Sequence, residues 1–179
     1  MSTAQAERRR IYPEIDQVLL RAMVVLGGTT MLVAAQAAGA RPAQWQQAVL
    51  LGFAVLTAVK PESIAGAALL AGGAYLWGLT PESLSPMVLL AAAGMVLAHV
   101  SALVAAQGPA RMHLDGAQVR RWTLRALALW LAAATVWGLS VYLADLPERR
   151  LAYALGLTVL SIIAVVTTWL IGNRPDRER

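Results

Sequence analysis

Residues 86–106 read PMVLLAAAGMVLAHVSALVAA, a stretch in which His99 is the sole ionisable side chain. A helix needs roughly 20 mostly apolar residues to cross a lipid bilayer. The stretch meets that length without an acidic residue, a lysine or an arginine. It therefore predicts a membrane-spanning helix.

The whole chain shares this apolar character. It has 179 residues, of which 58% are hydrophobic and 14% are charged, and its mean hydropathy is +0.58. A soluble domain carries about 25% charged residues, so this composition excludes an ordinary cytosolic enzyme. The chain has no Cys and two His, which excludes disulfides and thiolate metal sites and leaves too few ligands for most histidine sites. We expect no metal and no cofactor.

Six stretches are apolar enough to be considered as spans. They cover residues 15–38, 43–59, 62–79, 86–106, 119–143 and 148–172. The pattern predicts an all-α, polytopic transmembrane helix bundle that forms a single domain, with basic tails at residues 1–12 and 173–179. The second and third stretches lie at the lower limit of length for a span. A re-entrant hairpin through residues 43–79, which would leave four full spans, is the competing interpretation.

The dipeptide Pro-Glu precedes four of the six stretches, as Pro13-Glu14, Pro61-Glu62, Pro81-Glu82 and Pro147-Glu148. Proline fits the first position of a helix, where its missing N–H has no intrahelical partner. A carboxylate there also interacts favourably with the positive end of the helix dipole. The repeat therefore predicts helix starts rather than a binding motif.

The distribution of positive charge predicts the orientation in the membrane. Cytoplasmic loops are enriched in Lys and Arg, and with both termini cytoplasmic twelve of the 15 basic residues lie on or near the inner side. We expect a multi-pass protein of the bacterial inner (cytoplasmic) membrane. The net charge of +5 is then explained by the basic residues on the cytoplasmic side of the membrane. No nucleic-acid partner is expected.

Small residues recur at helical spacing in the interior stretches. Gly94, Ala98 and Ala102 are four residues apart, and Gly72 and Gly78 belong to similar small-residue pairs in the third stretch. In lipid, faces of small side chains let helix backbones approach closely. These residues are predicted to pack against neighbouring helices.

A few ionisable residues within or beside the stretches are weak candidates for binding. His99 lies about 10 Å of helical rise from the inner end of its stretch. It is expected to donate a hydrogen bond to a neighbouring helix, and a proton relay is the alternative role. Arg21 is expected to extend its side chain towards the headgroups. Arg111, Arg120 and Arg121 form a basic cytoplasmic surface suited to anionic lipid headgroups or a cytosolic partner. No nucleophile and base occur together, so no catalytic residue is assigned.

One resemblance follows from particular segments. Residues 60–66 (KPESIAG), 84–91 (LSPMVLLA) and 106–109 (AQGP), together with His99, resemble a family of uncharacterised small integral membrane proteins of high-GC actinobacteria. Members of that family are often encoded beside a MoxR-type AAA+ ATPase and its von Willebrand-like partner. The resemblance implies an accessory role in an envelope-associated assembly and identifies no functional residue.

Two functions remain open at this point. The first is a non-enzymatic accessory or scaffold subunit in the lipid bilayer, which packs through its small-residue faces against another membrane protein or a second copy of itself. The alternative is a small transporter or channel with a polar site near His99, in which Gly27-Gly28-Thr29-Thr30 would break the first helix. A membrane-embedded enzyme is the least favoured interpretation.

Overall fold

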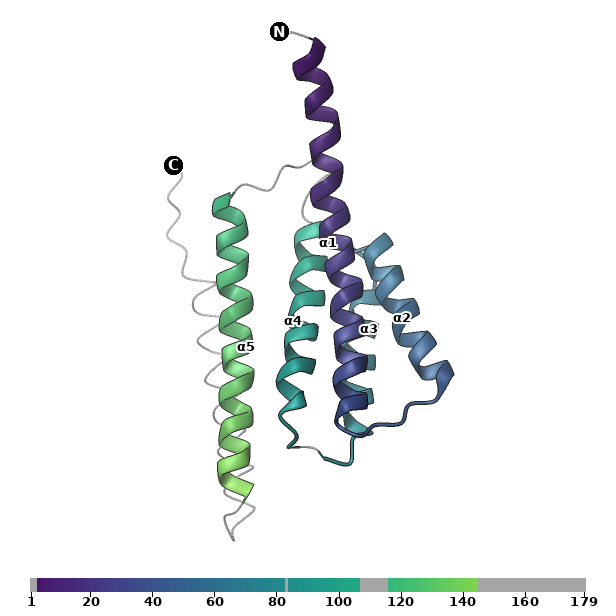
Figure 1. Cartoon of the computed structure of the whole chain (residues 1–179), viewed down its shortest axis with the longest axis vertical. Helices are drawn as coiled ribbons and strands as arrows, with labels where there is room; N and C mark the ends of the chain where they lie inside the picture. Colours follow the sequence, from purple (N-terminus) through teal and green to yellow (C-terminus); the bar gives the residue numbers. More distant parts are fainter. Residues whose placement is uncertain (1–2, 83, 107–115, 145–179) are drawn as a thin grey trace. The chain divides into compact units, whose positions relative to one another are not determined.

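The described part of the chain is entirely helical. The computed structural model describes residues 3–82, 84–106 and 116–144, with side chains from residue 16 onwards (Figure 1). Its helices are α1 (Thr3–Ala37), α2 (Gln44–Val59), α3 (Ala65–Gly78), α4 (Met87–Ala106) and α5 (Gly116–Ala144). No strand occurs in these ranges, so the prediction of an all-α chain is confirmed for them.

The chain divides into two compact units, Met1–Trp130 and Leu131–Arg179. The first contains α1 to α4 and the first half of α5, and the described part of the second is the remainder of α5. Everything that follows about packing and cavities concerns the first unit.

The described helices do not support six spans. Three of them are long and apolar enough to cross a membrane: Asp16–Ala37 within α1, Met87–Ala106 and Gly116–Ala144. At 16 and 14 residues, α2 and α3 are shorter than the 17 or more that a span usually needs. The sixth predicted stretch, 148–172, lies outside the described residues. The structure thus agrees with a membrane protein and shows three candidate spans.

Three of the four Pro-Glu dipeptides do not begin a helix, and the fourth, Pro147-Glu148, lies outside the described residues. Pro13-Glu14 lies inside α1. The chain after α2 makes a turn in which the Ser63 N–H donates to the Lys60 carbonyl at 3.0 Å, so α3 begins at Ala65 and not at Glu62. A second turn follows Pro81, with the Ser85 N–H donating to the Glu82 carbonyl at 3.1 Å. At both places a hydrogen-bonded turn, closed by the Ser63 or the Ser85 N–H, stands where the sequence pattern predicted the first turn of a helix.

The closest packing in the unit joins α1 to α4, which lie side by side in Figure 1. A Cβ added to Gly27 would lie 2.5 Å from the Gly94 carbonyl oxygen and 2.7 Å from the Ala98 backbone nitrogen. Since α1 is helical throughout residues 27–30, the expected break at Gly27-Gly28 is wrong. The glycines serve close packing of two backbones, as small residues do between helices in lipid.

The buried core lies where α2 and α3 pack against this pair. Leu50, Leu69 and Leu76 are among the largest fully buried side chains, and they form one cluster with Met31 of α1. A Cβ on Gly73 would come within 2.5 Å of the Met31 sulfur. Large side chains of one helix therefore fill the space beside small residues of a neighbouring helix. This packing holds the short helices α2 and α3 in the unit.

The Gly27 contact gives a direct test of this packing. We expect Gly27→Ala to lower the free energy of unfolding by about 2 kcal/mol, because the added methyl group meets backbone atoms that cannot rotate away. Gly52→Ala is the matched control, since no atom lies within 4 Å of its Cβ position. There the better helix propensity of Ala should give a gain of up to about 1 kcal/mol. Circular dichroism during unfolding in detergent measures both, and equal effects of the two substitutions would contradict this packing.

Candidate functional site

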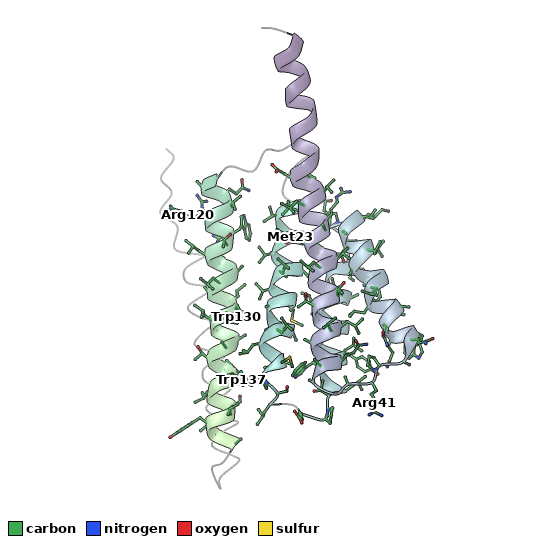
Figure 2. All side chains as sticks on the ribbon, viewed as in Figure 1. Met23, Arg41, Arg120, Trp130 and Trp137 are labelled. Atoms are coloured by element: carbon green, nitrogen blue, oxygen red, sulfur yellow. The ribbon has the colours of Figure 1, made fainter. Side chains whose placement is uncertain are left out.

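An apolar cavity of about 590 Å³ lies among α1, α4 and the part of α5 that belongs to the first unit. Figure 2 shows Met23 on α1 and Trp130 on α5, two of its lining residues. The walls come from α1 (Asp16, Leu19, Leu20, Met23), α4 (Ala93, Val96, Leu97, Val100, Ser101, Val104) and α5 (Val119, Trp122, Thr123, Ala126, Leu127, Trp130). This volume lies within the range of about 300–1,000 Å³ that is usual for small-molecule sites.

Helical periodicity explains why α5 presents this wall. Its lining residues recur at intervals of three and four from Val119 to Trp130, the spacing that places side chains on one face of an α-helix. The Trp130 indole N–H donates a hydrogen bond of 2.9 Å to the Leu89 carbonyl of α4. This bond ties the last turn of the wall to the start of α4 and gives the half-buried indole N–H an acceptor.

Polar groups are few in the cavity and lie mainly at one end. Asp16 enters from α1, and Trp122 and Thr123 come from the early turns of α5. The opposite end is formed by Ala93, Leu127 and Trp130. The lining contains one carboxylate and neither a histidine nor a lysine, so it offers no acid and base pair. The cavity is suited to hold an apolar body with a polar end.

Basic residues stand at the polar end. The Arg125 guanidinium carbon lies 5.0 Å from the centre of the Trp122 ring, a cation–π contact. Arg120 and Arg121 precede it and are exposed, and Figure 2 shows Arg120 in the first turns of α5. Arg111, which was predicted to belong to the same surface, lies outside the described residues. The described part of this surface is therefore the beginning of α5.

The two ionisable residues singled out from the sequence do not line the cavity. His99 is exposed on α4, and it makes no hydrogen bond or ion pair with the described part of the chain. Arg21 is exposed on α1. His99 follows Ala98, which faces α1, and precedes Val100, which faces the cavity. The structure thus places it on a third side of α4.

The small residues named from the sequence lie at different kinds of position. Gly94, Ala98 and Ala102 are buried along α4. A Cβ on Gly72 would lie 3.0 Å from a Leu50 methyl group, whereas one on Gly78 would meet no atom within 4 Å. Among the described residues, Gly94, Ala98 and Gly72 therefore pack within the chain, and Gly78 does not.

Sequence reasoning missed the residues that line the cavity. Trp130 and Asp16 line the cavity, and neither is among the candidates selected from the sequence. The three-and-four spacing from Val119 to Trp130 was a usable signal, because it marks one face of α5 that combines Thr123 with two tryptophans. Among the described residues, no group of three or more His, Cys, Asp or Glu side chains could hold a metal ion.

Comparison with known proteins gives no relative: no family model, curated protein or solved structure matches this chain.

The exposed position of His99 leads to a prediction about stability. We expect His99→Leu to leave the unfolding midpoint in detergent unchanged, because exposed side chains without partners usually contribute less than about 0.5 kcal/mol. Ser101→Leu, two residues along α4, is the control at a buried position. It should cost about 1–3 kcal/mol through overpacking. A clear loss of stability in His99→Leu would mean that the imidazole is bonded inside the bundle.

Proposed function

We propose that the chain is a non-enzymatic, multi-pass protein of the bacterial cytoplasmic membrane that acts as an accessory subunit of a membrane assembly. The observation that carries this proposal is the surface of α5. This helix has 29 residues and the composition of a span, yet Leu143 is the one residue of it that is buried. A span-length helix with this much uncovered surface is suited to contact a further helix as well as lipid.

The exposed surface of α5 is made of large apolar side chains. Leu124 and Leu129, which belong to the first unit and do not line the cavity, have exposed fractions of 58% and 41%. By contrast, Gly94 and Ala98 on α4 already face α1. A partner helix therefore has α5 available to it, and the small-residue face that the sequence first suggested is used within the chain.

The first turns of α5 support a cytoplasmic partner surface. Arg120 and Arg121 are exposed there, and Arg111 precedes them in the sequence. Basic residues at the end of a span favour the cytoplasmic side. On the proposed topology these arginines face anionic headgroups or a cytosolic component of the assembly.

The alternative of a transporter with a polar site near His99 gains no support. The cavity of the first unit does not include His99, and its walls are mostly apolar. A path for a polar solute needs donors and acceptors along it, which these walls do not offer.

We propose the six-span topology with both termini cytoplasmic, with α2 and α3 as two short spans, over a re-entrant hairpin. Because the chain has no Cys, single cysteines report sidedness directly. Lys60→Cys, in the exposed turn after α2, should react with a membrane-impermeant maleimide in inside-out vesicles, and Arg41→Cys should react in cells with a permeabilised outer envelope. Lys60→Cys that reacts from neither side until detergent is added would show a re-entrant hairpin.

The accessory role is tested by photo-cross-linking in the native membrane. A benzophenone amino acid at Leu124 of α5 should give a discrete adduct with another membrane protein. The matched control is Val55 of α2, which has a similar exposed fraction of 52%, and we expect its adduct to be at least fivefold weaker.

Two outcomes would contradict the accessory role. Equally weak adducts at both positions, with no protein retained on purification in mild detergent, would mean that α5 contacts only lipid. An adduct that contains only this chain would replace the accessory role with a homo-oligomer.

A further inference from the structure

The cavity beside α5 has the dimensions of an elongated channel. Its lining runs from Ala93 to Val104 on α4 and from Val119 to Trp130 on α5, and each of these segments rises by about 16 Å. With a volume of about 590 Å³, the space is long and narrow. It lies against three helices that are long and apolar enough to cross a membrane.

Its walls are unsuited to water. A buried water needs two to four polar partners, and over most of its length the channel offers Leu, Val, Ala and Met side chains. A flexible hydrocarbon chain is apolar and narrow, so it is suited to fill a space with these walls. The bilayer supplies such chains at high concentration to any helix that lies in it.

The polarity of the two ends gives the channel a direction. The end near Trp130 is lined by the indole whose N–H donates to the Leu89 carbonyl. At the other end Asp16, Trp122 and Thr123 line the space. Arg125 is not a lining residue, but its guanidinium lies against the Trp122 ring. A carboxylate in the lining with a guanidinium beside it matches the two charges of a zwitterionic headgroup, since guanidinium groups bind phosphate well.

We infer that this channel binds one acyl chain of a zwitterionic phospholipid. The methyl end of the acyl chain lies near Trp130, and the headgroup lies at the end formed by Asp16 and Trp122, in the leaflet where α5 begins. The inference rests on the membrane location in the proposed function and not on the proposed partner subunit.

The test is photolabelling of the full chain in lipid vesicles. The probe is phosphatidylethanolamine with a diazirine in one acyl chain, and labelled residues are located by peptide mass spectrometry. We expect labels on Leu97 and Val100, which line the channel, and also on Leu124, whose exposed fraction of 58% marks the outer surface of α5.

A pair of substitutions on α5 separates the channel from the general lipid contact. Ala126→Phe fills the channel, while Ala128→Phe adds the same ring at a position that does not line it. Labelling of Leu97 and Val100 should fall at least fivefold in Ala126→Phe and stay unchanged in Ala128→Phe, with Leu124 labelled equally in both. Ala93→Phe, with Ala92→Phe as its control, repeats the comparison on α4 in case Ala126→Phe does not fold.

Each other result overturns the inference in a distinct way. Labelling of Leu124 without labelling of Leu97 and Val100, or equal labelling in Ala126→Phe and Ala128→Phe, would show that no acyl chain occupies the channel. Failure to label any of these residues would show that the chain is not inserted in the bilayer, which would also overturn the membrane location. A missing partner subunit in the cross-linking experiment affects neither readout.

Discussion

The close approach of α1 and α4 is the constraint on which the first unit depends. At Gly27 and Gly94 the two backbones come so near that neither position has space for a side chain. In water, burial of large side chains would supply most of the stability, but between helices in lipid the gain comes from dispersion contacts at short distance. The two glycines allow the backbones of α1 and α4 to approach to that short distance. Met31 and Leu50 belong to the buried cluster that packs against this helix pair.

The sequence predicted the helical class and the longest spans well, because these follow from composition and length. The stretch 86–106 coincides with α4, Met87–Ala106, to within one residue. The start of α3 was less accessible, since the hydrogen bonds of Ser63 in the preceding turn compete with helix formation and leave no periodic signal. Pro61-Glu62 and Pro81-Glu82 lie between helices and so mark a boundary without its exact residue, whereas Pro13-Glu14 lies within α1 and marks none.

The site was predicted poorly for a related physical reason. Ionisable residues within spans are the functional candidates that a sequence offers, and His99, the one in the stretch 86–106, lies outside the cavity. The cavity depends instead on how three helices are placed, which is a tertiary property that a single sequence does not reveal. Trp130 illustrates the difference: its position was readable, but its bond to the Leu89 carbonyl requires α4 and α5 to be neighbours.

The contact between Gly27 and Gly94 also affects the order in which the chain can assemble. These residues are 67 positions apart, so the tightest pair of helices is completed only after α2, α3 and half of α4 have been made. At a synthesis rate of about 5–20 residues per second, α1 waits for roughly 3–13 s with its glycine face uncovered. During that time any other helix with small residues competes for the same face. Contacts this distant in sequence slow folding, and insertion of the short pair α2 and α3 becomes a step that precedes the native pairing.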